Sequence, residues 1–310
     1  MPLRVFLTAA DSPLGVAVSN ALTAAGHDIA TAVARADAIA VLDDAQGGTL
    51  VSIAESLVGR AAALLDSIPA SVKRLVVATG ADVYGEGPAE CTACGHVRPE
   101  NRPNDVIAPW EPRCPRCEGP LTPAGVREDE RVQPATPLSA LRLSREDLLL
   151  AWGLSSGVGV VSLRMFEVYG PRVVTGAVHA MASAIRAGGA PELAEDGLLT
   201  RDFVHVRDAA KAVVLALTHS RAPGHIFNVG SGKGLRLSSV AAAMVMAQTA
   251  EIEVKPSGEH RRGEPRHLFA ETMKIRHTLG WKLEVAFSAG VSEAVLDWFE
   301  SRRGPGGTGS

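Results

Sequence analysis

Four cysteines are the residues whose types and spacing point most directly to chemistry. They form two C-x-x-C pairs, Cys91 with Cys94 and Cys114 with Cys117, separated by nineteen residues. Each pair can place two thiolates on one side of a metal ion, and two pairs complete a tetrahedral site of four sulfurs, as in zinc ribbons. We therefore expect a structural Zn²⁺, with a rubredoxin-like iron site and disulfides as the alternatives. Four protein ligands would close the coordination shell, so we expect no metal catalysis.

The segment around these cysteines differs in composition from the rest of the chain. From about residue 87 to 127, proline, arginine and cysteine replace alanine, valine and leucine, and the hydrophobic periodicity is lost. This change predicts an inserted zinc-ribbon module that serves as a lid, a substrate-selecting wall or a docking surface. His96 is an alternative metal ligand, although a surface position fits it better when four cysteines are present.

A second candidate site is the N-terminal stretch TAADSPLG, which runs from Thr8 to Gly15. It lies between the apolar run LRVFLTA, a predicted buried strand, and PLGVAVSNALTAAGH, a predicted helix. Backbone N–H groups at such a helix N-terminus can bind the pyrophosphate of a dinucleotide. Asp11 or Ser12 is expected to cap the helix, and the Asp11 carboxylate would then compete with a bound phosphate. The residues that would line a cofactor here are Thr8, Asp11, Ser12, Leu14 and Gly15.

The elements that must position these residues alternate between strand and helix. Strands are expected at residues 3–9, 28–34, 36–45 and 73–80, and helices at 13–27, 49–68 and 139–153. Further strand–helix pairs follow at 157–189, 202–220 and 225–248, and the chain ends in helix, loop, helix. Alternation of this kind predicts an α/β fold, a doubly wound parallel sheet with helices on both faces.

Composition limits the functional classes. The 310 residues carry a formal net charge of -3 and are 46% hydrophobic, so a large core can form and nucleic acid is an unlikely partner. Apolar runs are too short for a membrane span, and the first residues do not resemble a signal peptide. We expect a soluble, cytoplasmic protein without membrane contact.

Four stretches resemble the extended short-chain dehydrogenase/reductase family, in particular its nucleotide-sugar epimerases and dehydratases. They are VYGEG (83–87), LRMFEVYGPR (163–172), RDFVHVRDAAKAV (201–213), and FNVGSG (227–232) followed by RRGEPRHLFAETMKIRHTLGW (261–281). The resemblance implies a Rossmann domain for NAD(P), a small C-terminal domain for a nucleotide sugar, and a homodimer.

The resemblance and the insertion together divide the chain. Residues 1–86 and 128–170 are expected to form the Rossmann domain, and residues 87–127 the zinc ribbon. Residues 171–300 would form mainly the substrate domain with returning Rossmann elements. Residues 301–310 are expected to be a flexible tail.

The cofactor loop departs from the family pattern T-G-x-x-G-x-x-G. The three glycine positions fall on Ala9, Ser12 and Gly15, so only the glycine needed for helix–strand packing remains. Val33 stands where the family has an acidic residue for the ribose, and nearby Arg35 could meet the 2′-phosphate of NADP. A strand and helices that help enclose the adenine are missing after that point. On these grounds NAD(P) binding is expected to be doubtful.

The catalytic positions depart as well. The family's Tyr and Lys fall on Leu141 and Arg145, and its Ser/Thr falls on Gly80 beside Thr79. Leucine cannot transfer a proton, and the arginine pKa is too high for proton exchange. Glu167, in place of a family asparagine, could supply the missing base. Thr79, Arg145 and Glu167 are therefore the candidate catalytic residues.

The substrate half keeps more of the family pattern. The arginines that bind the nucleotide diphosphate in the family correspond to Arg201 and Arg261, with Glu264 in place of an aspartate. The competing interpretation is that these arginines only pair with carboxylates across the domain junction. We expect an atypical member that acts on or binds a nucleotide sugar or related small molecule. A non-catalytic pseudoenzyme that uses the ribbon for binding, and an ordinary NAD(P)-dependent epimerase or reductase, are the alternatives.

Overall fold

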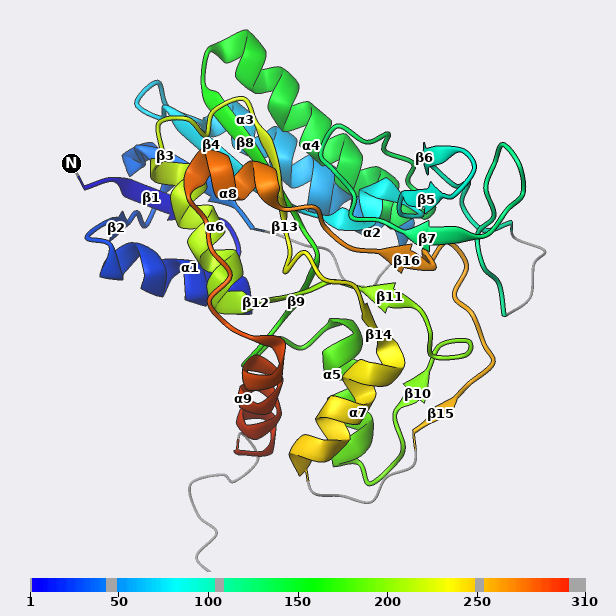
Figure 1. Ribbon diagram of the computed structural model, residues 1–310. Coiled ribbons are helices and arrows are strands. Elements are labelled where there is room, and N and C mark those ends of the chain that lie inside the picture. Colours follow the sequence, from blue (N-terminus) through cyan, green and yellow to red (C-terminus); the bar gives the residue numbers. More distant parts are fainter. Residues whose placement is uncertain (1, 43–48, 104–108, 249–253, 301–310) are drawn as a thin grey trace, which may run out of the picture.

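The computed structural model describes residues 2–42, 49–103, 109–248 and 254–300, and its centre is a six-stranded parallel sheet (Figure 1). The strand order is β13-β8-β4-β3-β1-β2. The strands are β1 (Arg4–Leu7), β2 (Asp28–Ile29), β3 (Ala38–Val41), β4 (Arg74–Gly80), β8 (Gly159–Met165) and β13 (Ile226–Val229). Every pairing in this sheet is parallel, as expected where helices connect consecutive strands.

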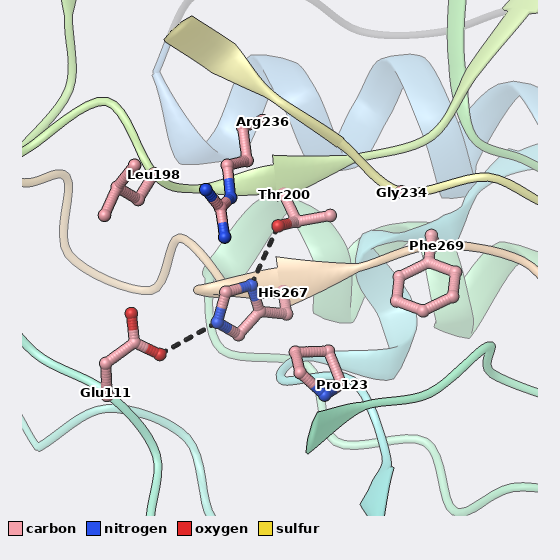
Figure 2. Close-up of a pocket in the computed structure, with 8 residues that line it drawn as sticks. All are labelled: Glu111, Pro123, Leu198, Thr200, Gly234, Arg236, His267 and Phe269. Carbon is pink, nitrogen blue, oxygen red and sulfur yellow. Dashed lines mark hydrogen bonds and ion pairs between the residues drawn. The ribbon is translucent and has the colours of Figure 1, made fainter. Parts of the chain in front are cut away.

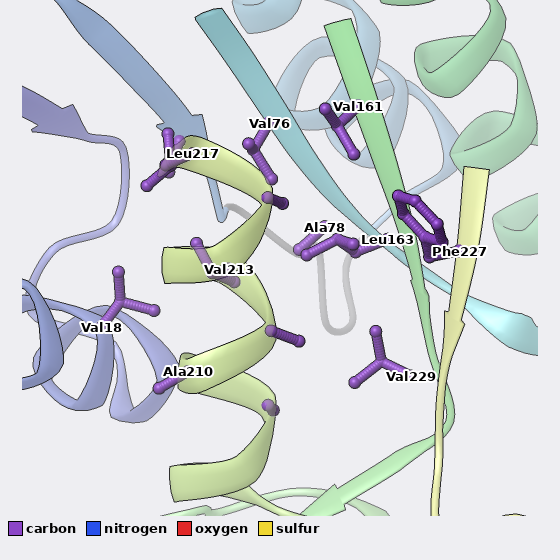
Figure 3. Close-up of a cluster of buried hydrophobic side chains, with 14 of the residues drawn as sticks. Val18, Val76, Ala78, Val161, Leu163, Ala210, Val213, Leu217, Phe227 and Val229 are labelled. Carbon is purple, nitrogen blue, oxygen red and sulfur yellow. The ribbon is translucent and has the colours of Figure 1, made fainter. Parts of the chain in front are cut away.

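Helices cover both faces of the sheet, which confirms the predicted doubly wound α/β fold. One face packs against α1 (Pro13–Ala24), α6 (Val206–Thr218) and α8 (Met273–Leu279), and the other against α3 (Arg60–Ser67) and α4 (Pro137–Ser156). A short helix, α2 (Leu50–Ala54), and one π-helical turn lead into α3. Strand residues alternate between the two cores. Val76 faces α6 (Figure 3), and its neighbour Val77 packs on the α3/α4 side.

The β2 edge of the sheet is shorter than the sequence predicted. Residues 28–34 were expected to form one strand, but β2 ends at Ile29 and residues Val33–Arg35 form a 3-10 turn. The chain has only eight residues in which to return from β2 to the start of β3 on the other side of β1. Among the described residues no strand lies beyond β2, so the elements expected to be missing are absent from this edge.

A second lobe is built from α5 (Gly176–Arg186), α7 (Leu237–Gln248) and α9 (Phe287–Glu300), which share an apolar core. Short strand pairs join this lobe to the sheet. They are β9 (Glu167–Tyr169) with β12 (Phe203–His205), β10 (Glu192–Leu193) with β15 (Lys255–Pro256), and the three-stranded sheet β14 (Leu235–Arg236), β11 (Thr200–Arg201), β16 (His267–Leu268).

The cysteine-rich segment forms its own small antiparallel sheet. Its strands are β5 (Ala89–Cys91), β6 (Gly95–Val97) and β7 (Leu121–Pro123), in the order β6-β5-β7. The tail predicted at 301–310 lies outside the described residues. In the part of the chain that the structure describes, no helix combines the length and apolar character that a bilayer span requires.

Candidate functional site

The loop between β1 and α1 has a backbone conformation that its sequence conceals. Ala9, at the first glycine position, has a φ of 46°, in the left-handed region that glycine adopts most readily. A side chain at Gly15 would lie 2.2 Å from the carbonyl oxygen of Ala9, so this glycine lets α1 pack directly on the loop. The tight turn and the close packing are therefore both present, although two of the three glycines are not.

The helix cap belongs to Ser12. Its side-chain oxygen accepts a hydrogen bond of 3.0 Å from the Gly15 N–H, which is the standard capping contact. Asp11 is exposed and has no hydrogen bond to the first turn of α1 within the described ranges. Competition between the Asp11 carboxylate and a phosphate was expected to arise from capping of α1 by Asp11. The structure does not show that capping contact.

The other predicted cofactor residues lie at different places around this loop. Thr8 Oγ1 accepts a 2.9 Å hydrogen bond from the Leu42 N–H and so joins the ends of β1 and β3. Leu14 is half-buried and packs against the core on the α1 face. Arg35 is exposed in the turn before β3, two residues from Asp37, which binds Arg4 at the start of β1. The loop itself follows the other end of β1.

The carboxyl end of β4 carries polar groups that the sequence analysis did not identify. Asp82 and Arg142 form an ion pair of 2.7 Å beside Gly80. A side chain at Gly80 would lie 2.4 Å from Asp82 Oδ1, so the family's Ser/Thr position is occupied by this ion pair. Thr79 is buried, and its hydroxyl has no hydrogen-bond partner among the described residues. The signal that could have identified Asp82 was its place immediately before the VYGEG motif.

Arg145 serves the fold at the position where the family has a lysine. It is buried, and its Nη2 donates a 2.5 Å hydrogen bond to the carbonyl oxygen of Ala78 on β4. The next residue, Glu146, pairs with Arg164 at 2.5 Å and accepts a hydrogen bond from Ser162. These contacts fix α4 against β4 and β8.

Glu167 follows β8 and lies close to several charged groups. Burial raises the pKa of its carboxyl group, Arg201 and the Ala177 N–H lower it, and Glu264 and Asp82 raise it further. A raised pKa is the property that suits a carboxyl group to proton transfer near neutral pH. We refer to Asp82, Arg142, Glu167, Arg201 and Glu264 together as the edge cluster, because they gather beyond the carboxyl ends of β4 and β8.

The substrate-binding candidates differ in their surroundings. Arg201 is buried and pairs with Glu264 at 3.0 Å, a contact of the kind that the carboxylate-pairing interpretation predicts. The second oxygen of Glu264 is buried without a partner among the described residues. Arg261 is exposed, and no ion pair of its side chain occurs in the described part of the chain.

The four cysteines come together as the spacing predicted. Their sulfur atoms all lie within 4.8 Å of one another, and none is in a disulfide. This grouping is compatible with a tetrahedral metal site. The ring nitrogens of His96 contact Glu90 and Glu130, each at 2.8 Å, so this histidine is engaged away from the sulfurs.

Buried charges attach the ribbon to the C-terminal half of the chain. Arg266 is fully buried and pairs with Glu111 of the ribbon at 2.6 Å, and with Asp196 and Glu195 at 2.7 and 3.0 Å. Glu86 accepts hydrogen bonds from the backbone N–H groups of Arg266 and His267, at 2.6 and 2.8 Å. Burial nevertheless raises the pKa of Glu86 to about 7.

Comparison of the sequence with known proteins identifies relatives. Residues 118–230 match the model of the NAD dependent epimerase/dehydratase family. The chain is 28% identical over 231 residues to dTDP-L-rhamnose 4-epimerase of Burkholderia thailandensis, covering 72% of this chain and 62% of that protein. It is 32% identical over 195 residues to UDP-glucose 4-epimerase of Azospirillum brasilense, covering 57% of this chain and 56% of that protein. The matches thus span about three fifths of these relatives.

Solved structures share the fold over nearly the whole chain. UDP-glucuronic acid 4-epimerase of Bacillus cereus, in complex with UDP-glucuronic acid and NAD, superposes with a TM-score of 0.77 at 17% identity, over 96% of this chain and 99% of that one. UDP-glucose 4-epimerase of Thermus thermophilus, in complex with NAD, gives 0.73 at 23% identity over the same shares.

These neighbours correct one expectation from the sequence. NAD(P) binding was expected to be doubtful because of the altered loop, yet structures with this fold hold NAD. The loop also has a left-handed residue at Ala9 and a serine cap, so it makes a tight turn without the first glycine. The reason given for doubt was therefore wrong. Together, the matched segment and these relatives show that the chain is similar to proteins of the NAD dependent epimerase/dehydratase family, and the solved structures show that it shares their fold.

Proposed function

We propose that this protein binds NAD and a nucleotide sugar beside the edge cluster and performs an epimerase- or dehydratase-type reaction without a catalytic tyrosine. The observation that carries the proposal is the convergence of Asp82, Glu167 and Arg201 beyond the carboxyl ends of the parallel strands. Ligands of open α/β sheets bind at this edge.

The residues present fit NAD. At the start of α1 the Leu14 N–H is available to a pyrophosphate, whereas Pro13 has no N–H, the Gly15 N–H donates to Ser12 Oγ and the Val16 N–H donates to the Ser12 carbonyl. The buried Thr79 hydroxyl lacks a described partner at the end of β4, where a bound molecule could satisfy it. When bound, NAD supplies a hydride acceptor and donor, and the protein's part is to hold the sugar and move a proton.

Arg201 is the residue best placed to receive a diphosphate. Its planar guanidinium can bind two phosphate oxygens at once. In the structure it pairs with Glu264, so an incoming diphosphate would have to displace or share this contact. Exposed Arg261 has no such competition and would provide a second cationic group.

Glu167 is the proposed general base. With its pKa raised mainly by burial, part of the carboxyl population stays protonated closer to neutral pH than an exposed glutamate would. It can therefore both accept and return a proton, the role that Leu141 cannot fill. Asp82, held by Arg142, would orient the sugar next to it.

The test is a turnover assay of purified protein with NAD and a panel of UDP- and dTDP-sugars, read by NMR of the sugar. Glu167→Gln should lower kcat at least about a hundredfold, the typical contribution of a general base, while NAD affinity stays unchanged. Glu55→Gln is the matched control, because Glu55 is exposed on the π-helical turn between α2 and α3 and is not part of the edge cluster. Full activity of Glu167→Gln would remove Glu167 from the mechanism.

A non-catalytic role is the second candidate, and Arg145 is the observation that favours it. Its guanidinium is engaged with the Ala78 carbonyl, and Leu141 adds no polar group to the same helix. On this alternative the protein would bind NAD and a nucleotide sugar, and Arg201→Ala would abolish sugar binding, but no sugar of the panel would be converted.

We propose in addition that Cys91, Cys94, Cys114 and Cys117 hold a structural metal ion, with zinc as the best match to four thiolates. The ribbon would then be a rigid support for Glu111 and Arg102, which pair with Arg266 and Glu195 of the C-terminal half. The domain division and the homodimer expected from the sequence remain predictions.

A further inference from the structure

A pocket of about 360 Å³ lies between the ribbon and the sheet β14-β11-β16 (Figure 2). Its ribbon wall comes from Glu111 and Pro123. Its other walls are Leu198, Thr200, Gly234, Arg236, His267 and Phe269. The volume is within the range of small-molecule sites.

Strand register places this pocket on the opposite face of the sheet from the edge cluster. Thr200 pairs with Arg236 on one side and with His267 on the other, so these three side chains share a face. Arg201 is the next residue along β11, and its side chain points to the other face, towards Glu264. The pocket is therefore separate from the proposed nucleotide-sugar site.

The polar wall of the pocket is held in place by fixed contacts. His267 Nε2 lies 2.9 Å from Glu111 Oε2, and its Nδ1 lies 3.0 Å from Thr200 Oγ1, as the dashed lines in Figure 2 show. Arg266 donates two hydrogen bonds to the other oxygen of Glu111, at 2.9 and 2.6 Å. The positive charge of its guanidinium offsets the negative charge of that carboxylate. The groups facing the pocket are thus preorganised before any ligand arrives.

The proton positions follow from these contacts. Burial lowers the pKa of His267, although Glu111 opposes the shift, so the ring is neutral near pH 7. The ionised Glu111 accepts the Nε2 proton, which leaves Nδ1 as an acceptor for the Thr200 hydroxyl proton. Thr200 Oγ1 then presents free lone pairs to the pocket and can accept a hydrogen bond from a ligand.

Arg236 supplies the cationic group. Figure 2 shows its guanidinium directed towards Thr200 and His267. Its side chain has no hydrogen bond or ion pair with any described residue. Apolar surface of Leu198, Phe269 and Pro123 lies around these polar groups. A guanidinium beside a hydrogen-bond acceptor matches a ligand that carries an anionic group next to a hydroxyl.

We propose that this pocket is a second ligand site for a small hydroxylated anion, a molecule with a carboxylate or phosphate on Arg236, a neighbouring hydroxyl on Thr200 and a compact body against Phe269 and Leu198. The site goes beyond the proposed function, because it needs neither NAD nor the edge cluster. Hydroxy acids and sugar phosphates share this chemistry.

The experiment is calorimetric titration of the full-length protein, without NAD, using mandelate and glucose 1-phosphate as the two probes. Binding of either probe at one site per chain is expected, and the preference between them identifies the carboxylate or the phosphate as the better head group. Phenylacetate, which lacks the hydroxyl, should bind several-fold more weakly than mandelate. Methyl mandelate, which lacks the charge, should not bind.

Variants locate the site. Arg236→Gln should weaken binding about ten-fold or more, the typical effect of losing a charge-assisted hydrogen bond. Lys233→Gln is the matched control, because Lys233 is exposed just before β14 but does not line the pocket. Thr200→Val should remove the preference for mandelate over phenylacetate.

Three results would overturn the proposal. One is the absence of binding by both probes at millimolar concentration. Another is an equal loss of affinity in Arg236→Gln and Lys233→Gln, which would indicate only diffuse surface charge. The third is loss of binding in Arg201→Gln with Arg236→Gln unaffected, which would place the probes at the edge cluster instead.

Discussion

Arg145 donates a 2.5 Å hydrogen bond to the backbone carbonyl of Ala78, so the cation at the family's lysine position binds the sheet. The contact joins the middle of α4 to β4, one residue before Thr79. An arginine can make this contact because its long side chain presents five N–H donors. The position that aligns with the family's lysine thus makes a structural contact in this chain.

The first prediction follows from that contact. Arg145→Met should lower the free energy of unfolding by roughly 2 kcal/mol or more, because the Ala78 carbonyl loses its partner inside the core. Arg60→Met, an exposed arginine at the start of α3, should change it by less than about 0.5 kcal/mol. Urea unfolding followed by circular dichroism measures both. Equal stability of the two variants would contradict a structural role for Arg145.

A second prediction concerns the cofactor loop. Ala9→Gly should raise the free energy of unfolding by up to about 1 kcal/mol, because glycine adopts the left-handed conformation without steric cost. Ala10→Gly is the control; Ala10 does not have a positive φ, so added chain entropy should make it neutral or destabilising. NAD titration of both variants tests the loop directly. NAD binding should be unchanged or tighter in Ala9→Gly, and weaker binding than in the parent chain would contradict the inference that Ala9 already has the conformation that glycine adopts in this loop.

Glu86 gives a prediction about pH. The folded protein keeps its proton up to about pH 7, whereas the ordinary pKa is 4.5, so the folded state binds more protons between these values. The free energy of unfolding should therefore fall as pH rises from about 4.5 to 7, by an amount on the order of 3 kcal/mol. Thermal unfolding at pH 5 and pH 7.5 would show it.

Comparison with a variant isolates this residue from other buried acids. In Glu86→Gln the decrease between pH 5 and 7.5 should be smaller than in the parent chain, because position 86 no longer titrates. Glu55→Gln, which removes an exposed carboxylate, should keep the parental slope. Identical slopes in all three proteins would show that Glu86 is ionised throughout this range.

The cysteine cluster leads to a prediction on metal content. Elemental analysis should find one zinc per chain, and Cys114→Ser should lose it, because the buried Cys114 sulfur is one of the four grouped atoms. His96→Gln should retain the full metal content, since its ring contacts carboxylates. Metal removal should also lower the thermal midpoint, because binding energy of a structural metal is folding energy. Well under one metal per chain in untreated parent protein would refute the site.

Much of the fold follows from local sequence signals. Pro13 and Ser12 mark the start of α1, and Thr136 with Ser139 forms a reciprocal cap at the start of α4. Apolar runs such as LRVFLTA indicated buried parallel strands, as observed. These signals act within a few residues, so the sequence is sufficient to place them.

The chemistry was less accessible from the sequence. Asp82 and Arg142 are sixty residues apart, and only the packing of α4 on β4 brings them together beside Gly80. The left-handed conformation of Ala9 could not be read from its residue type, because an alanine reaches it only where surrounding contacts compensate the steric cost. This is why comparing glycine counts led to the wrong expectation about NAD(P).

The sequence by itself determined the alternating strand–helix order and the grouping of four cysteines, since period and spacing are properties of the chain. Tertiary structure decided which charged groups meet. Arg266 pairs with Glu111, 155 residues earlier in the chain, and Thr200 aligns with both His267 and Arg236 across three strands. Such long-range contacts depend on how buried charges find partners when elements pack, and no local pattern encodes that choice.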